Sequence, residues 1–365
     1  MKLHKLTSFL EALAPLSYQE SYDNSGLIVG SPDMDISGAL VALDCTEKVL
    51  DEAIRLGYNL VISHHPIVFK GLKRFNERHY VERIVAKAIR ENIALYAIHT
   101  NFDNVLHGVN GMICAKLGLQ KPEILAPKEG MLEQLSVFVP LQHAEALKNA
   151  LFAAGAGAIS RYTECSFSVE GVGTFKPNAG ATPYTGVEGK RHQEPESRVE
   201  VIFPKERRKA VLMAMFEIHP YEEVAYNIYA LNNAYQEVGS GMIGQLETPM
   251  PARAFLSYLK ENLKVEVIRH TELPEKPIER VAVCGGAGSF LLPQAIGSGA
   301  DIFVTADFKY HEFFEADGKI LVADIGHFES EQFTQDLLLG KIQKKFPNFA
   351  IRLTEENTNP IKYYF

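Results

Sequence analysis

Apolar strands alternate with amphipathic helices at both ends of this chain, and this alternation limits the possible folds more than any other feature of the sequence. The apolar runs lie at 39–43, 59–62, 94–98, 281–284, 301–305 and 319–324. The helix-forming stretches between and after them lie at 47–56, 80–90, 111–117 and about 330–345. Strands that are apolar along their whole length are typical of parallel sheets covered on both faces. The sequence therefore predicts an α/β fold with a parallel-rich sheet flanked by helices.

The middle of the chain follows a different pattern, which predicts an inserted domain. Alternating strands are expected at 133–139, 165–169, 198–203 and 224–229, and helices at 144–153 and 207–217. This order, βαββαβ, is that of a ferredoxin-like fold. We therefore expect residues 130–235 to form the insert, and residues 1–129 plus 236–365 to form one discontinuous α/β domain. The glycine-rich stretch 239–244 is expected to be a flexible return from the insert.

Composition and charge narrow the classes of partner and compartment. The formal net charge is −8 and the basic runs are short, so a nucleic-acid partner is not expected, whereas divalent cations would be attracted. The four cysteines contain no CxxC pair, which indicates reduced thiols. The first residues lack a secretory apolar region, and no uncharged run is long enough for a membrane span. These features indicate a cytoplasmic protein without a membrane partner.

Imidazole and carboxylate groups follow three of the predicted strands. His64 and His65 follow the strand at 59–62, His99 and Asp103 follow the strand at 94–98, and the strand at 319–324 is followed by His327 and Glu331. In open parallel sheets, ligands bind beyond the carboxyl ends of the strands. Three strand ends would therefore present these groups to one crevice.

This combination of groups favours a metal site with two divalent cations. The predicted ligands are His64, His65, Asp103, His327 and Glu331. Zinc suits the ligand set best, and iron, manganese and nickel are alternatives. A bridging carboxylate can serve two ions at once, and Glu331 is the candidate bridge. Taken singly, the same residues could be ordinary polar groups, such as a capped turn or an i,i+4 surface pair.

Other polar groups near strand ends allow two interpretations each. Backbone amides of residues 285–288 could cradle an anion or form a tight strand-to-helix turn. Asp307 and His311 could line the crevice or support ligands, or they could be a cap and a surface histidine. Asp44 could orient a ligand imidazole or simply begin a helix.

Several motifs in order along the chain resemble the NIF-three-like family (Ngg-interacting factor three), also called GTP cyclohydrolase I type 2 homologs. The motifs are YDNSGL (22–27), SHHP (63–66), HTNFD (99–103), GGAG (285–288), TADFKYH (305–311) and GHFESE (326–331). The insert resembles CutA and PII-type modules, with HPYE (219–222) as its mark. Two departures are visible: Tyr22 stands where many members have Trp, and Ala306 where many have Gly.

The resemblance implies a two-metal site inside a ring-shaped homohexamer. One ion would take His65, Asp103 and Glu331, and the other would take His64, His327 and Glu331. His99 would lie beside the site as an auxiliary group. The family name asserts a cyclohydrolase, but the family has no settled common reaction.

The preferred function is a metal-dependent hydrolase that acts on a nucleotide-like or other phosphate-bearing small molecule. Metal ions would activate water as the nucleophile, and His99 or His311 could move the proton as the catalytic acid or base. The alternative is a non-catalytic metal-binding regulator or oligomeric scaffold with a PII-like sensing insert, because a fold alone cannot assign a function.

Overall fold

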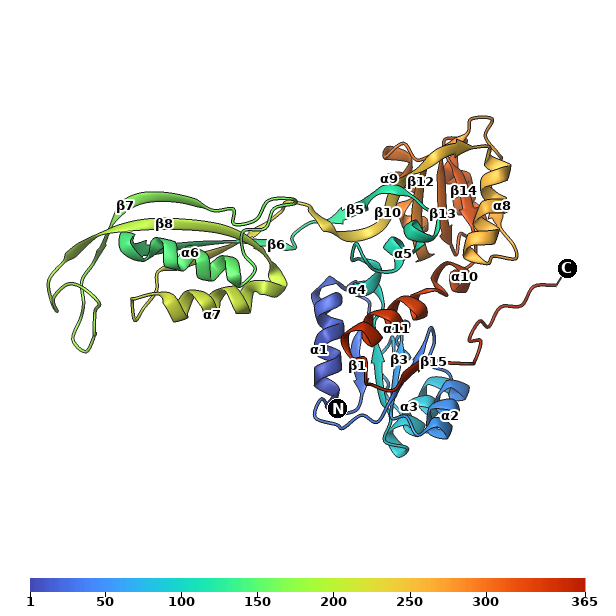
Figure 1. Cartoon of the computed structure of the whole chain (residues 1–365), viewed down its shortest axis with the longest axis horizontal. Coiled ribbons are helices and arrows are strands. Elements are labelled where there is room, and N and C mark those ends of the chain that lie inside the picture. The colour runs from blue at the N-terminus through green and yellow to red at the C-terminus, as the bar shows by residue number, and fades with distance from the viewer. Residues whose placement is uncertain (365) are drawn as a thin grey trace. The chain divides into compact units, whose positions relative to one another are not determined.

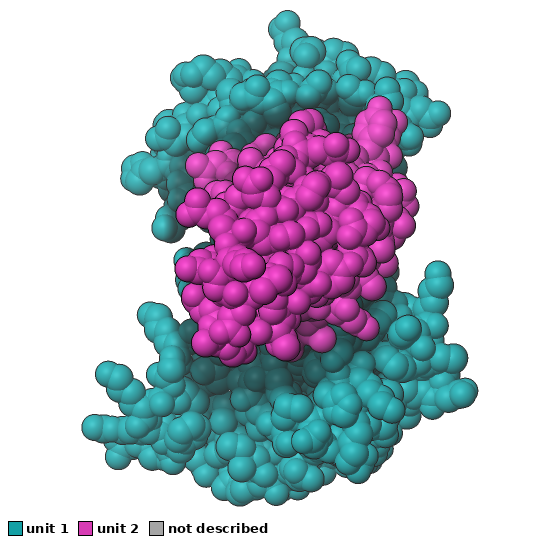
Figure 2. Space-filling model, turned by 90° about the vertical axis from the view of Figure 1, so that its left-hand side faces the viewer, with its two compact units in different colours: residues 1–127, 237–365 teal, residues 128–236 magenta. Residues whose placement is uncertain are grey.

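The computed structural model describes residues 1–364, which fall into two compact units. The first unit combines residues 1–127 with the chain from residue 237 onward, and the second is formed by residues 128–236 (Figure 2). Within the described chain, no helix has both the length and the apolar character needed to cross a membrane.

The first unit begins with a mixed five-stranded sheet. Its strands are, in order, β1 (Gly26–Val29), β4 (Ala94–Ala97), β3 (Leu60–Ser63), β2 (Ala39–Ala42) and β15 (Ile351–Leu353). All neighbours are parallel except β1, which pairs with β4 in the antiparallel direction. Helix α2 (Glu47–Leu56) follows β2. It begins after Thr46, whose side chain accepts from the Val49 amide at 3.3 Å, and it ends at Gly57, which has φ 69°.

The first unit contains a second, six-stranded sheet, so the expectation of a single sheet is wrong. Its order is β11 (Arg269–His270), β14 (Leu321–Asp324), β13 (Ile302–Ala306), β12 (Ile278–Ala287), β10 (Tyr235–Met250) and β5 (Gln120–Lys128). Strands β12, β13 and β14 are parallel, and β10 and β11 pair with them in the antiparallel direction. The glycine-rich stretch 239–244 lies inside β10, so it is an ordered strand rather than a flexible return.

Helices cover both faces of each sheet, as the apolar strands predict. One core lies between the sheets and contains apolar side chains of both, together with helices α1 (Leu3–Leu13), α5 (Val109–Lys116), α8 (Ala252–Leu263) and α11 (Thr334–Lys345). Helices α2 and α3 (Tyr80–Arg90) pack on the outer face of the five-stranded sheet. Helix α9 (Leu292–Gly297), labelled in Figure 1, packs on the outer face of the six-stranded sheet. The 3-10 segment η5 (Tyr310–Ala316) shares the same core.

The second unit is a four-stranded antiparallel sheet with two helices. The sheet order is β7 (Phe167–Phe175), β8 (His192–Pro204), β6 (Leu132–Pro140) and β9 (Tyr226–Leu231). Helices α6 (Ala144–Ala153) and α7 (Arg208–Ile218) share one core with the sheet. Strands β7 and β8 are longer than the sequence predicts, because they continue as a paired ribbon as far as Phe175 and His192.

Candidate metal centre

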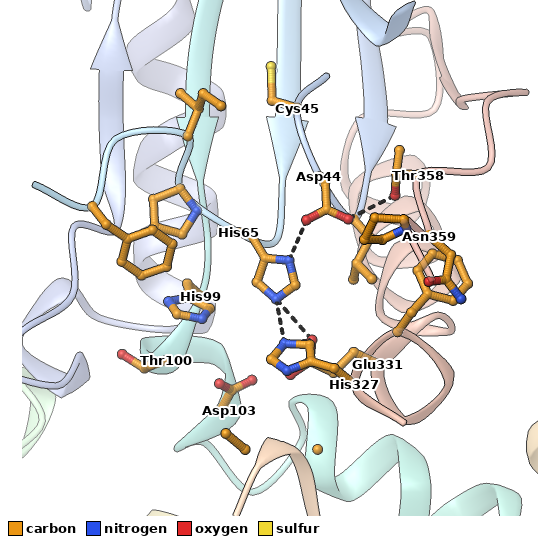
Figure 3. Close-up of a pocket in the computed structure, with 18 of the residues that line it drawn as sticks. Asp44, Cys45, His65, His99, Thr100, Asp103, His327, Glu331, Thr358 and Asn359 are labelled. Carbon is orange, nitrogen blue, oxygen red and sulfur yellow. Dashed lines mark hydrogen bonds and ion pairs between the residues drawn. The ribbon is translucent and has the colours of Figure 1, made fainter. Parts of the chain in front are cut away.

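Three strand ends of the first unit bring the predicted ligands together. His64 and His65 leave β3, and their amides still bond to the backbone carbonyls of Ala42 and Leu43 at 3.2 and 3.0 Å. His99 is the N-cap of the short helix α4 (Thr100–Asp103), which carries Asp103 at its end. The expected helix over 330–345 is two helices, and the first, α10 (His327–Glu331), holds His327 and Glu331 one turn apart. Figure 3 shows His65, His99, Asp103, His327 and Glu331 around one point.

Glu331 lies at the middle of the cluster, because each of its carboxylate oxygens faces a different pair of ligand atoms. Oε1 lies 3.8 Å from Nε2 of His64, and the same nitrogen lies 3.5 Å from Oδ1 of Asp103. Oε2 lies 3.0 Å from Nε2 of His65 and 3.2 Å from Nε2 of His327. The cluster therefore contains two groups of three potential ligands that share Glu331, and each group could hold a metal ion.

This division differs from the one that the family resemblance implies. His64 groups with Asp103, and His65 groups with His327, whose Nε2 lies 3.2 Å from that of His65. The reason is geometric. Adjacent residues leaving a strand point to opposite sides, so that His64 is directed toward helix α4 and His65 toward helix α10.

Each imidazole of the cluster is anchored through Nδ1, which leaves Nε2 available. The Nδ1 atom of His64 donates to the carbonyl oxygen of Ile98 at 2.8 Å. The carboxylates of Asp44 and Asp307 accept from Nδ1 of His65 and His327 at 2.8 and 2.7 Å, respectively. Metal-binding histidines characteristically donate their other ring nitrogen to a carboxylate or carbonyl, which fixes the tautomer. Asp44 and Asp307 therefore have the supporting geometry that the sequence left open.

Two buried atoms of the cluster have no hydrogen-bond partner among the described residues. They are Nε2 of His64, a side chain with 0% exposure, and Oδ1 of Asp103. Leaving a buried polar atom unpaired costs about 1–3 kcal/mol. Burial, reinforced by the charge of Glu331, raises the pKa of Asp103 to about 8. A cation beside these two atoms would satisfy both, so the residues present fit a metal ion.

The other half of the cluster also favours added positive charge. Although burial opposes the charged imidazole, hydrogen bonds to Asp44 and Glu331 raise the pKa of His65 to about 10. Burial also opposes the charged form of His327, but Glu331 and Asp307 raise the pKa of this imidazole to about 11. Carboxylates that stabilise protons this strongly would also stabilise a metal cation in their place.

The two histidines predicted to move protons lie in different places. His99 is buried beside the cluster, with its ring centroid 5.3 Å from those of both His64 and His65. Its Nδ1 donates to Asp23 at 2.8 Å. His311 is exposed on η5, contacts the ring of Tyr310 edge to face, and is not among the residues that line the cavity over the cluster. The structure brings His99 to the site and leaves His311 outside it.

The glycine-rich turn at 285–288 makes room for Glu331 instead of presenting free amides. The amides of Gly285 and Gly286 donate to Asn110 Oδ1 and Ser330 Oγ, both at 2.9 Å. A Cβ atom on Gly286 would lie 2.4 Å from Oε1 of Glu331. The backbone at Gly286 therefore passes too close to the carboxylate for a side chain, and the amides of Gly285 and Gly286 are not free to cradle an anion.

A cavity of about 930 Å³ opens over the cluster. Four of the aromatic residues that line it are about half exposed or more. Their exposed fractions are 67% for Tyr22, 49% for Phe69, 53% for Tyr80 and 60% for Phe290. The residues 356–361 near the end of the chain also line it. The site is therefore accessible to a small molecule with a planar group.

Sequence reasoning missed the supporting role of Asp23. This carboxylate accepts from His99 and from both the amide and the hydroxyl of Thr100. Although burial opposes ionisation, the bonds from the side chains of His99 and Thr100 keep its pKa well below the ordinary value. Asp23 lies within the motif at 22–27 but 76 residues from His99, and no local spacing links the two. Sequence reasoning also did not predict that residues 356–361 line the cavity, because they show no pattern of chemical groups.

Fold and site together define a two-sheet α/β protein with a buried histidine–carboxylate cluster that could hold metal. Comparison with known proteins makes the family definite. The chain belongs to the Duf34/NIF3 (NGG1p interacting factor 3) family, whose sequence profile matches residues 1–360.

Individual relatives match along the whole chain. A Bacillus subtilis protein named "GTP cyclohydrolase 1 type 2 homolog" is 37% identical over 98% of both chains. The crystal structure of a Bacillus cereus protein related to NIF3 matches with a TM-score of 0.86 and 37% identity, covering 100% of this chain and 99% of the other. A Staphylococcus aureus structure matches with a TM-score of 0.78 and 28% identity, with the same coverage.

Proposed function

We propose that this protein is a two-metal hydrolase that acts on a nucleotide-like or other phosphate-bearing small molecule. The observation that supports it most is the placement of Glu331, whose two oxygens face separate groups of nitrogen and oxygen ligands. We propose His64, Asp103 and Glu331 as ligands of one cation and His65, His327 and Glu331 as ligands of the other. Zinc is the preferred metal. Two such cations would supply Lewis acidity for a hydrolytic displacement.

His99 is the residue that we propose to hold and move a proton. Its Nδ1 is bonded to the ionised Asp23, so its Nε2 is the nitrogen left to exchange a proton. Its ring lies beside the proposed ligands, where that nitrogen could serve the reacting group. The bond to Asp23 also holds the ring in place.

The cavity lining supports a substrate that combines a planar ring with phosphate. Exposed rings such as Phe69 and Tyr22 could stack on a base, a contact typically worth ~1–3 kcal/mol per base. Phosphate oxygens are ligands that divalent cations accept. Opening of a guanine ring, which the name of the Bacillus subtilis relative suggests, is one reaction in this class.

The test is turnover by protein depleted of metal and reloaded with zinc, manganese, iron or nickel. The panel would contain nucleotides, including GTP, and simple phosphoesters. We expect metal-dependent release of product that Glu331→Gln abolishes, whereas Glu315→Gln, at an exposed site on η5, retains it. His99→Gln should lower kcat by ~10²–10⁴-fold with metal content retained, and His311→Gln should not. Metal binding without turnover on the whole panel would instead support the regulator or scaffold.

We also propose that residues 128–236 are an inserted ferredoxin-like module of the CutA and PII type. The element order β6–α6–β7–β8–α7–β9 and the placement of β6 and β8 at the middle of the sheet support this. For the assembly we propose a homohexamer, on the strength of the family resemblance.

A further inference from the structure

The segment that follows β15, residues 354–363, contains no helix or strand, yet specific bonds hold it against the first unit. Its first attachment is to Glu52 of α2, whose side chain is 2% exposed. The Thr354 hydroxyl and the Glu355 amide both donate to this carboxylate. A segment without helix or strand stays in one place only where such bonds hold it.

The second attachment reaches the candidate metal centre. The Thr358 hydroxyl donates to Oδ2 of Asp44 at 2.8 Å, and Oδ1 of the same carboxylate accepts from Nδ1 of His65 at 2.8 Å (Figure 3). A carboxylate with a donor on each oxygen is restrained from rotating about its axis. Thr358 therefore helps to set the direction in which the His65 ring presents Nε2.

The third attachment is to the helix that carries two of the proposed ligands. The side-chain amide of Asn359 donates to Oε1 of Glu329 at 3.1 Å, and the Tyr363 hydroxyl donates to the same oxygen at 3.5 Å. Glu329 is 8% exposed and lies on α10 between His327 and Glu331. The neighbouring residues Thr358 and Asn359 therefore bond to Asp44, which supports His65, and to helix α10, which carries His327 and Glu331.

We propose that residues 354–363 form a strap that positions the metal ligands. Thr358 is a positioning residue for His65 through Asp44, and Asn359 is a positioning residue for helix α10 through Glu329. Asp44 follows the five-stranded sheet, whereas α10 follows the six-stranded sheet, so the strap holds the ligands of the two sheets at a fixed spacing. This proposal rests on the metal-binding part of the proposed function.

The decisive variant is Thr358→Val, which removes the hydroxyl and keeps the shape. Bound zinc per chain would be measured over a series of buffered free-zinc concentrations, with circular dichroism to confirm folding. We expect the affinity of the His65 and His327 group to fall by roughly two- to tenfold, the value of one net hydrogen bond. The affinity of the His64 and Asp103 group should change less, because His64 is anchored on a backbone carbonyl.

Two further variants separate positioning from general stability. Thr358→Ser should restore the affinity, because it restores the hydroxyl. Thr182→Val is the matched control: it removes a hydroxyl that donates to the Glu222 carboxylate at 2.7 Å in the second unit, and it should leave zinc binding unchanged. Equal loss in the control and in Thr358→Val would overturn the proposal.

A double-mutant cycle tests whether Thr358 acts through Asp44. Asp44→Asn alone should weaken zinc by ~10–100-fold, as losses of supporting carboxylates typically do. In that background Thr358→Val should have little further effect, whereas a separate structural role would give additive losses. Additive losses would contradict positioning through Asp44.

The Asn359 arm is tested by Asn359→Ala, which should weaken zinc in both groups because α10 carries the shared Glu331. Unchanged zinc affinity in folded Asn359→Ala would contradict the positioning role of Asn359. If wild-type protein binds no zinc, or binds it equally well after Glu331→Gln, the metal centre itself fails. If wild type binds zinc and folded Thr358→Val binds it as tightly, only the strap proposal fails.

Discussion

The individual imidazoles of the site differ in what holds their Nδ1 atoms, and this decides how each will respond to substitution. His64 donates to a backbone carbonyl that no side-chain change can remove. His65 and His327 donate to Asp44 and Asp307, which can be replaced. The orientation of the His64 ring is therefore held by the backbone, whereas the orientations of His65 and His327 depend on two side chains outside the candidate ligand set.

Substituting Glu331 should affect both proposed ion positions, whereas substituting a ligand that serves a single ion should affect mainly one. Substituting His65 or His327 by Ala should mainly empty one ion position, and substituting His64 or Asp103 by Ala should mainly empty the other. Glu331→Ala should weaken both, because it would remove the carboxylate that the two proposed cations share. Even unit charges 4 Å apart interact by about 4 kcal/mol at an effective dielectric near 20.

Bound metal per chain at controlled free metal, with circular dichroism on each variant, measures this pattern. Full occupancy in all five variants would show that these residues are ordinary polar groups. If Glu331→Ala emptied a single position, the bridging role would be wrong while a two-metal site could survive.

At the scale of elements, the site depends on how closely the turn after β12 approaches helix α10. Gly286 has φ 65°, a conformation that disfavours a side chain, and a Cβ there would collide with Glu331. The Ser330 hydroxyl donates to the carbonyl of His327 and accepts from the Gly286 amide, so the turn and the helix are held together. The glycine is therefore required by the carboxylate opposite it.

Gly286→Ala should displace the Glu331 carboxylate and lower zinc affinity by at least tenfold, and strain in the backbone should lower the free energy of unfolding by about 1–3 kcal/mol. The matched control is Gly297→Ala at the end of α9, where a Cβ would meet nothing within 4 Å. There we expect unchanged zinc affinity and equal or slightly higher stability. Zinc titration and urea unfolding measure both effects, and normal zinc affinity in Gly286→Ala would contradict the close-approach account.

At the scale of the whole molecule, the chain leaves and re-enters the first unit at adjacent strands. Strands β5 and β10 are neighbours in the six-stranded sheet, and residues 128–236 connect them. Because the ligands of the candidate site all belong to the first unit, its metal affinity should not require the second.

Replacing residues 129–234 with a short Asn-Gly turn should therefore leave a folded protein that binds zinc as the full chain does. The second unit has its own core, so residues 128–236 expressed alone should also fold. Circular dichroism and zinc titration test both. An unfolded deletion protein without metal would show that the two units depend on each other.

The proposed hexamer predicts a definite mass in solution. Light scattering at micromolar concentration should give about six times the 40.6 kDa of one chain. A monomer at that concentration would contradict the proposed hexamer, but it would not bear on the candidate metal site of the single chain.

The sequence by itself determined which imidazole and carboxylate groups gather at one place. Apolar runs specify buried strands, and groups that follow parallel strands gather at one edge, so His64, Asp103 and Glu331 could be predicted from local pattern. The same periodicity does not specify which strands share a sheet, because it records only which faces are buried. The second sheet, and the strand formed by residues 239–244, were therefore not foreseen.

Only the tertiary structure decided which of these side chains contact one another. His65 and Glu331 are 266 residues apart and come from different sheets, and their 3.0 Å contact depends on how those sheets pack. The same holds for Asp23 with His99 and for Thr358 with Asp44, which are linked across 76 and 314 residues. Side-chain hydrogen bonds are effective only over about 3 Å, whereas sequence patterns place elements far more coarsely than that, so the division of ligands and their support had to come from the fold.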